Sequence, residues 1–424
     1  MADNKLQEYI CPNCGGPLEF RGDVQKMVCV YCESEFDMSQ FTANDVKHEE
    51  KTDWSQSQGQ TLEAGAQGMA EWECNACGAV MVSDGQVGAT ECPYCGNPAI
   101  VQSTFEGMNL PDGIIPFTVT KQQAQDALKG YYSGKKLIPD SFISNNRVEK
   151  IQGVYVPFWL FDCEADGSVF YKAVKRGRSY TKKNGEETEN WHEELDYAVS
   201  RRATMRYEKV PADGSKEMKD EYMDSIEPFD YSKIIAYNSA YFSGYLASKY
   251  DESAEEVKER VDKRIRNTTQ EAIRDTVTGY DSVSTESANI HMNNGKINYC
   301  MLPVWMLTTQ WNGGQYTFAM NGQTGKVTGD LPIDSGKSTK LFMLTLIISL
   351  VISELIAFFL LGGEGLWLGV AAVISLIIAF ISVSSAKSSM VAHNKTEAKH
   401  YVVQGSFKLI SQNDRHIGTR QVKG

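Results

Sequence analysis

The chain has 424 residues, with 42 Lys+Arg against 54 Asp+Glu and a formal net charge of −12. This length allows two or three domains with a sizeable core, so the composition excludes a disordered, tail-like protein. The mean hydropathy of −0.35 is typical of a soluble protein, but it averages over one long apolar block at residues 341–383. Membrane attachment is therefore the first feature that the average hides.

The beginning of the chain, residues 1–8, is polar and carries no apolar signal-peptide core and no lipidation motif. We therefore expect the N-terminus to stay in the cytoplasm. In that reducing compartment, paired cysteines bind metal more often than they form disulfides. Of the 10 cysteines, all but two fall into Cys-x-x-Cys pairs, and this pattern predicts metal sites.

The paired cysteines form two sets with the same internal spacing, Cys-x2-Cys-x14-Cys-x2-Cys, related by a shift of 63 positions. Each Cys-x-x-Cys segment can form a tight turn, called a knuckle. Two knuckles direct four thiolates at one ion with tetrahedral geometry. The sequence thus predicts one zinc ribbon at residues 1–40 and a second at residues 71–104. The expected ligands are Cys11, Cys14, Cys29, Cys32, Cys74, Cys77, Cys92 and Cys95. Because four thiolates leave no open coordination position, we expect two structural Zn²⁺ ions, one per ribbon. A rubredoxin-type iron site uses the same ligands and stays open as an alternative.

Residues 18–20 and 80–82 are expected to be β-hairpin arms of the ribbons, which are too small to hold a core without metal. Their charge argues against nucleic acid. Residues 1–40 carry three Lys+Arg against seven Asp+Glu, and residues 71–104 carry four acidic and no basic residues. A surface that displaces counterions from phosphates needs a basic patch. Protein recognition and simple bracing of the next domain are the interpretations that remain for the ribbons.

After the first ribbon, residues 41–70 are rich in Gln, Ser, Gly and acidic residues and lack an apolar period, which predicts a flexible linker. Residues 105–336 follow the second ribbon as the largest soluble block, and we expect them to form a cytoplasmic α+β domain. Its first helix should be capped by Thr118 or Thr120.

Two related β units are predicted within this domain. Residues 153–172 indicate a strand, a turn ahead of Gly167 and a second strand, and residues 299–318 repeat the pattern 146 positions later. Each first strand contains Pro-x-Trp, beginning at Pro157 and Pro303. Proline within a strand predicts an edge or a bulge, and the Trp is expected to anchor the core.

Between the β units, residues 229–250 and 253–276 are expected to be helical. Ser253 and Glu256 form a capping box, and the second helix has an apolar stripe. Its cations are matched by neighbouring acids, which indicates a solvated face rather than a polyanion site. These cations are Lys258, Arg260, Lys263, Arg264 and Arg266.

The domain has no recognisable catalytic motif: the phosphate-binding loop, the zinc-protease helix and the serine-hydrolase elbow are all missing from the sequence. His192 and His291 have no second ligand or base at a useful spacing, so they are interpreted as ordinary histidines. Cys163 and Cys300 are interpreted as small buried hydrophobic residues. We therefore expect no enzymatic activity.

Residues 341–383 predict a transmembrane helical hairpin. Residues 341–361 and 366–383 are each long and apolar enough to span hydrocarbon, and the short segment between them places both flanks on one side. The flanking lysines, by the positive-inside rule, put that side in the cytoplasm. They are Lys337, Lys340, Lys387 and Lys395. A buried hairpin in a soluble core is the alternative. Glu354 is the one charge within the spans, and we assign it no function.

The tail, residues 384–424, carries seven Lys+Arg against two Asp+Glu. Such a basic tail can lie on anionic lipid headgroups next to a span. Residues 401–410, however, are rich in β-branched and aromatic residues and favour a strand that returns to the α+β domain. We prefer the strand.

Several motifs together resemble the bacterial TFIIB-type zinc-ribbon-containing membrane proteins, and the likeness covers nearly the whole chain. The motifs are the four Cys-x-x-Cys knuckles, Ile115-Pro116-Phe117, the strand at residues 155–162, Gly244-Tyr245-Leu246 and the C-terminal hairpin. Some members are labelled primosomal-helicase-like zinc-ribbon proteins, although this sequence has no ATPase motif. The resemblance implies a membrane-anchored adaptor, with PspA-like or flotillin-like SPFH proteins as possible partners, and carries over only the eight cysteines as ligands.

The expected architecture is therefore multidomain α+β, with two N-terminal four-cysteine zinc ribbons, a cytoplasmic α+β domain with two related β units and a transmembrane helical hairpin. The expected function is a two-pass inner-membrane adaptor or scaffold with both termini in the cytoplasm, recruiting proteins to the bilayer, for example in envelope stress. One alternative is a membrane-held, nucleic-acid-associated ribbon protein. Another is a thiol redox sensor that releases zinc on oxidation.

Overall fold

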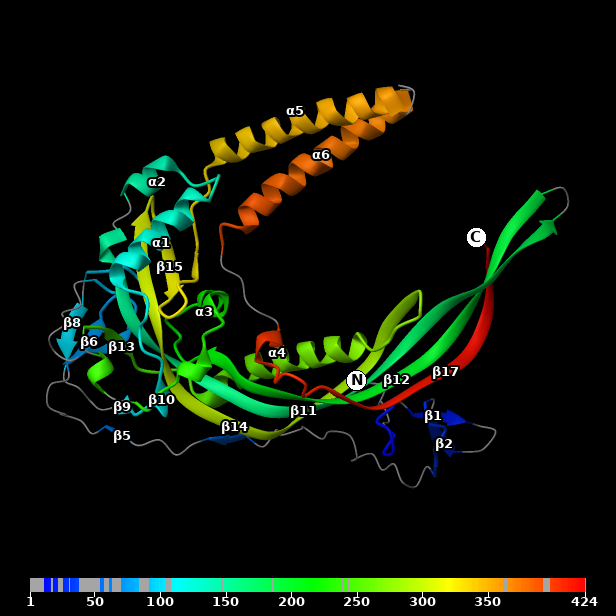
Figure 1. The fold of residues 1–424 in the computed structure, drawn as a ribbon, viewed down its shortest axis with the longest axis horizontal. Coiled ribbons are helices and arrows are strands. Elements are labelled where there is room, and N and C mark those ends of the chain that lie inside the picture. Colours follow the sequence, from blue (N-terminus) through cyan, green and yellow to red (C-terminus); the bar gives the residue numbers. More distant parts are fainter. Residues whose placement is uncertain are drawn as a thin grey trace, which may run out of the picture.

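The computed structural model combines a mixed β-sheet with helices, two cysteine clusters and two long apolar helices (Figure 1). It describes residues 11–16, 18–21, 26–29, 31–37, 54–56, 61–62, 70–83, 91–98, 100–103, 108–145, 148–184, 187–237, 239–242, 244–360, 365–391 and 397–423.

Four long antiparallel strands build the body of the molecule and curve into an arch (Figure 1). In spatial order they are β14 (Ser282–Trp311), β11 (Gln152–Asn184), β12 (Glu187–Asp213) and β17 (Lys408–Lys423). The register of β11 shifts against β12 between Phe161 and Cys163 and against β14 between Asp162 and Glu164. Because bulges bend strands, this shared position divides the arch. Beyond the bulges, β14, β11, β12 and β17 lie side by side, and we call this part of the arch the distal ribbon. It is a part of the main sheet and is distinct from the two cysteine-containing ribbons.

Shorter strands complete a 12-stranded sheet at the near end of the arch. They are β4 (Trp54–Gln56), β6 (Ala70–Cys74), β7 (Val80–Ser83), β8 (Ile100–Ser103), β10 (Gly113–Ile114), β13 (Leu246–Ser248), β15 (Gly314–Asn321) and β16 (Val327–Gly329). Two smaller sheets contain β1 (Leu18–Arg21), β2 (Lys26–Cys29) and β3 (Glu35–Phe36), and β5 (Thr61–Leu62) with β9 (Met108–Asn109). The second cysteine cluster thus belongs to the main sheet, whereas the first has a sheet of its own.

The predicted turn ahead of Gly167 is wrong, because β11 runs unbroken from Gln152 to Asn184. Gly167 faces the long helix that crosses the sheet. A Cβ at this position would lie 2.8 Å from Cδ1 of Ile273, so the glycine allows close helix packing rather than a turn.

The two predicted β units are consequently not alike, since only residues 299–318 contain a hairpin, formed by β14 and β15. Their Pro-x-Trp strands instead pair with each other, with Tyr155 opposite Pro303 and Pro157 opposite Met301. Both prolines lie inside the sheet. On one side of its strand, each proline lies at the point where one neighbouring strand stops pairing and the next starts. The expected edge position is therefore also wrong. Trp159 and Trp305 are buried, as expected of core anchors.

Two helices begin at the caps that the sequence predicts. α1 (Lys121–Ser133) has Thr120 as its N-cap, and α4 (Ala254–Arg274) has the Ser253 capping box. α4 lies on the concave side of the arch and buries its apolar stripe against the long strands (Figure 1). The remaining short helices are α2 (Asp140–Asn145) and α3 (Asp220–Ile226).

The predicted helix at residues 229–250 is wrong. The described part of this segment contains two 3₁₀ turns, Tyr231–Lys233 and Ser239–Phe242, followed by β13. Gly244 adopts a φ of +83°, which a right-handed helix does not allow.

The solvated face predicted for α4 is wrong at Arg264, which is 1 % exposed. Its guanidinium group donates two hydrogen bonds to the buried Glu227, at 3.1 and 2.6 Å. Arg264 lies seven residues after Val257, within the buried stripe, and this spacing is the signal that its charge concealed.

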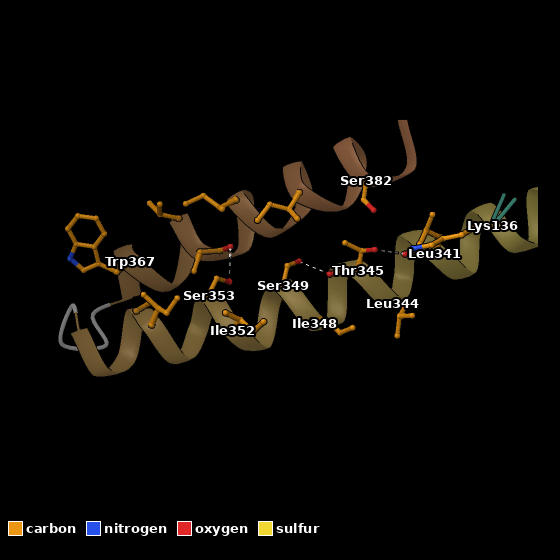
Figure 2. A pocket seen from close by; sticks show the side chains of 16 residues that line it. Lys136, Leu341, Leu344, Thr345, Ile348, Ser349, Ile352, Ser353, Trp367 and Ser382 are labelled. Atoms are coloured by element: carbon orange, nitrogen blue, oxygen red, sulfur yellow. Dashed lines mark hydrogen bonds between the residues drawn. The ribbon is translucent and has the colours of Figure 1, made fainter. Parts of the chain in front are cut away.

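Two helices, α5 (Ser335–Leu360) and α6 (Gly365–Ser388), form the apolar hairpin. Both are long and apolar enough to cross a membrane, and few of their residues are buried. Serines join them: the hydroxyls of Ser353 and Ser375 are 2.8 Å apart (Figure 2). The predicted turn comprises residues 362–365, of which only Gly365 is described, as the first residue of α6. Lys395 also lies outside the described residues.

The tail does return to the sheet, but its strand begins at Lys408 and pairs with β12, so most of the expected strand at residues 401–410 is not extended. The tail's cations pair with acids on β12 and the first ribbon, as in Arg420–Glu194 and Arg415–Glu33, at 2.9 and 2.6 Å. These contacts disfavour the lipid-bound alternative for the distal part of the tail.

The flexible linker expected at residues 41–70 is wrong for its described residues before Ala70, which are strands β4 and β5. β4 pairs with β14, and Trp54 packs edge-on against Phe161 at 5.2 Å between ring centroids. The other residues of this segment before Ala70 lie outside the described part of the chain.

Candidate metal centres

All four Cys-x-x-Cys segments fold in the same way. The N–H group four residues after the first cysteine donates to that cysteine's carbonyl, and the cysteine's own N–H donates to the carbonyl five residues on, at 2.7 to 3.0 Å. The residue at the fourth position is left-handed, with φ of +74° at Gly15, +58° at Glu33, +81° at Gly78 and +69° at Gly96. Glycine adopts this conformation at little cost, so Glu33 is the strained member of the set.

These turns bring the predicted ligands together in two clusters. The Sγ atoms of Cys11 and Cys32 are 3.6 Å apart, and those of Cys14 and Cys29 are 3.4 Å apart. In the second cluster the distances are 3.6 Å for Cys74 and Cys95 and 3.7 Å for Cys77 and Cys92. Within each cluster all four Sγ atoms lie within 4.8 Å of one another.

Zinc–sulfur bonds of about 2.3 Å in a tetrahedron require sulfur–sulfur separations of about 3.8 Å, close to those found. Both clusters can therefore hold an ion of this size, which supports the coarse prediction of two metal sites. Among the described residues, no further group of three or more Cys, His, Asp or Glu gathers as closely.

Burial opposes the ionisation of several sulfurs in the two clusters. Burial raises the pKa of Cys11 to about 11 and that of Cys92 to about 12. Burial also opposes ionisation of Cys32, but hydrogen bonds with Ser34, Cys14 and Cys29 together outweigh it and lower the Cys32 pKa to about 7. Four thiolates at this spacing need a compensating positive charge, and a divalent cation that supplies it must displace protons from the thiols.

The first ribbon packs on the convex face of the distal ribbon, opposite α4 (Figure 1). Tyr31, inside the second knuckle, contacts Phe170 of β11 at 4.3 Å between ring centroids. Its hydroxyl donates to Glu286 of β14 at 2.6 Å, and its carbonyl accepts from Asn413 of β17 at 3.3 Å. One tyrosine beside the metal ligands thus contacts three of the four long strands.

The second ribbon continues the main sheet, because β7 pairs with β13. Tyr94, the counterpart of Tyr31 after the shift of 63 positions, is buried. The Thr308 hydroxyl of β14 donates to the carbonyls of Pro93 and Tyr94, at 2.7 and 3.0 Å. Ion pairs of Glu71 with Lys249 and of Glu91 with Lys150 also attach the second ribbon to the rest of the domain.

The two tyrosines are the residues whose role the sequence reasoning missed. Both tyrosines occupy the same position of the repeat, and the sequence shows this. A single sequence does not distinguish an aromatic residue that packs inside a ribbon from one that attaches the ribbon to the sheet. In the structure residues beside both cysteine clusters contact the long strands directly.

The other singled-out residues lie apart from the clusters or beside them. His192 is 3.5 Å from Glu194, and His291 lines a polar cleft of about 340 Å³ between the first ribbon and the sheet. Cys163 and Cys300 are buried, as interpreted, and burial raises the pKa of each to about 12. Glu354 is half-buried on α5.

Comparison with known proteins gives one informative relative. The chain is 36% identical over 239 residues to the uncharacterized protein YdjG of Bacillus subtilis (strain 168), a match that covers 56% of this chain and 69% of YdjG. The chain belongs to the YdjG family. No family model matches, and no solved structure matches. The YdjG match covers most of the relative but names no activity, so the likeness to TFIIB-type zinc-ribbon proteins stays a prediction.

Proposed function

We propose that the protein is a membrane-anchored zinc-ribbon scaffold that recruits other proteins to the cytoplasmic face of the cell membrane. The observation that carries this proposal is the place of the apolar hairpin in the chain. α5 follows β16, α6 is followed by β17, and both strands belong to the same sheet.

This connectivity supports a topology in which both ends of the hairpin lie on one side of the membrane. The lysines at the hairpin's base independently favour the cytoplasmic side. The sheet and both metal centres would then lie together in the cytoplasm. Such an arrangement suits a protein that presents a large surface at the bilayer.

In this scaffold the two ions, which we take to be zinc, are structural. Their sites offer four cysteines each and no open position for a substrate. Tyr31 and Tyr94 connect the sites to the sheet, so the metals would brace the surface that partners meet. The acidic ribbons support protein partners rather than nucleic acid.

Insertion places one demand on the fold. The hairpin extends over the concave side of the arch, in the same general direction as the distal ribbon (Figure 1). The distal ribbon carries charged side chains such as Arg202 and Asp166, which hydrocarbon excludes. The distal ribbon must therefore bend away from an inserted hairpin. The paired bulges at Phe161–Glu164 are the natural place for that bend.

The test is to purify the tagged protein from its own membranes with nuclease present, after washing the membranes with carbonate. The wild type is compared with Cys74→Ser/Cys77→Ser and with the matched first-ribbon variant Cys11→Ser/Cys14→Ser. We expect a carbonate-resistant protein with a stoichiometric protein partner that at least one variant loses. Release by carbonate would refute the membrane anchor. No partner, or one that nuclease alone removes, would refute the recruiting function.

A further inference from the structure

The base of the hairpin gathers lysines from three separate segments. Lys135 and Lys136 follow α1, Lys337 and Lys340 lie in the first turns of α5, and Lys387 lies at the end of α6. We call these five lysines the basal collar. The acids in the same segments are Asp140 and Asp334, and Asp140 is already paired with Lys337 at 2.7 Å.

Contacts hold the collar together as one surface. Lys337 also donates to the carbonyl of Ile138 at 2.7 Å, and Lys135 donates to the carbonyl of Ser389. Leu331, before α5, donates its N–H to the carbonyl of Met390, after α6, at 2.8 Å. The turn between α1 and α2 is thereby fastened to the point where the chain enters and leaves the hairpin.

The length of the helices sets the depth of the collar. From Leu341 to the end of α5 at Leu360 the helix spans about 30 Å at 1.5 Å per residue, which is the thickness of the hydrocarbon layer. An inserted hairpin therefore has Lys340 at the boundary between hydrocarbon and headgroups. The collar lies at the level of the lipid phosphates.

Four members of the collar have no counter-charge among the described residues: Lys135, which donates to the carbonyl of Ser389, and three exposed lysines. Lys136, Lys340 and Lys387 are exposed, and none of them forms an ion pair with any described residue. An anion from outside the chain can neutralise the three free lysines.

An apolar groove leads to one of these lysines, Lys136. It runs between α5 and α6, has a volume of about 790 Å³ and is lined by residues such as Ile348, Ile352 and Ile374. Lys136 lies at the basal end of this groove, beside Leu341 (Figure 2). An apolar groove that ends at an unpaired cation is complementary to a phospholipid, whose acyl chain is apolar and whose phosphate is anionic.

We propose that this groove and collar bind an anionic phospholipid, with an acyl chain along the groove and the headgroup at Lys136, Lys340 and Lys387. The bound lipid holds the turn between α1 and α2 on the membrane surface. The inference rests on the proposed insertion of the hairpin, and it adds a ligand class and a binding site to it.

The test uses the full-length protein in bilayer nanodiscs of phosphatidylcholine with or without phosphatidylglycerol. Acetylation of single lysines, followed by mass spectrometry, reports their exposure. Lys136 and Lys340 should react several-fold more slowly in discs that contain phosphatidylglycerol, whereas Lys121, at the far end of α1, should not change. Inorganic phosphate added to phosphatidylcholine discs should give no protection. Equal reactivity of Lys136 in both discs, or equal protection by free phosphate, would overturn the proposal.

Variants then separate the headgroup from the acyl chain, with the number of retained phosphatidylglycerol molecules measured by native mass spectrometry. Removing the three free lysines, in Lys136→Gln/Lys340→Gln/Lys387→Gln, should weaken retention by about fivefold per lysine. The control Lys121→Gln/Lys233→Gln/Lys263→Gln makes the same charge change at exposed positions away from the collar and should retain lipid normally. Unchanged retention in the collar variant would overturn the proposal.

Thr345→Phe fills the groove without changing charge and should also reduce retention. Normal retention in this variant would overturn the place of the acyl chain in the groove. Failure to enter nanodiscs at all would overturn the membrane anchor, whereas entry without any preference for phosphatidylglycerol would overturn the lipid site alone.

Discussion

Replacing Arg264 by methionine should destabilise the protein strongly, although the new side chain is apolar and similar in length. Arg264 donates to both carboxylate oxygens of Glu227, to the carbonyl of Pro211 at 3.0 Å and to that of Glu397 at 3.2 Å. Asp224 lies 3.6 Å away, and both carboxylates are 1 % exposed. The Arg264→Met variant leaves the Glu227 carboxylate buried without its cation, a loss that costs about 3–5 kcal/mol.

The magnitude is tested by the urea dependence of proteolysis on detergent-solubilised protein. The free energy of unfolding should fall by about 3–5 kcal/mol in Arg264→Met. The double variant Arg264→Met/Glu227→Gln should recover part of that loss, because it no longer strands the Glu227 charge. Tyr401→Phe, which removes only a hydrogen bond to Glu227, should cost about 1 kcal/mol. A single variant within about 1 kcal/mol of the wild type, or a double variant no better than the single one, would refute the reasoning.

Three further predictions concern the metal centres and a buried acid. Elemental analysis should find two metal ions per chain in the wild type and one in Cys74→Ser/Cys77→Ser; equal content would contradict the second site. In Gly78→Ala the added Cβ would meet no atom within 4 Å, but the alanine must adopt a φ of +81°. Because this conformation is costly for alanine, the metal affinity of the second site should fall by about fivefold, as measured by chelator competition. Burial raises the Asp213 pKa to about 7 despite its Arg260 partner. The folded state therefore holds a proton that the unfolded chain has released, so stability should fall as pH rises from about 4 to 7, and Asp213→Asn should remove that component. A pH profile that Asp213→Asn leaves unchanged would contradict it.

Local signals in the sequence were sufficient wherever chemistry or capping fixed a short segment. The cysteine spacing located both clusters, Thr120 and Ser253 marked two helix starts, and the apolar block located the helices α5 and α6. Each of these rests on a pattern of residues within a short stretch of the chain, which a single sequence displays.

The long strands could not be predicted in the same way, because a partner far along the chain decides them. Asp166-Gly167 has the composition of a turn, yet Gly167 is extended and gives room to Ile273 of α4. The charge of Arg264 indicated solvent, although its position in the helix stripe indicated the core. Glycine and arginine each have two uses, and only the neighbouring strand or helix selects between them.

The hydrogen bond from Leu331 to Met390 has a practical consequence for the architecture. Since the chain enters and leaves the hairpin at almost the same point, the two apolar helices are inserted between ends that are in contact. A short turn in place of residues 335–389 would join two ends that already touch. The excised form should be a water-soluble protein with both metal centres intact, in which partners of the sheet can be sought free of detergent.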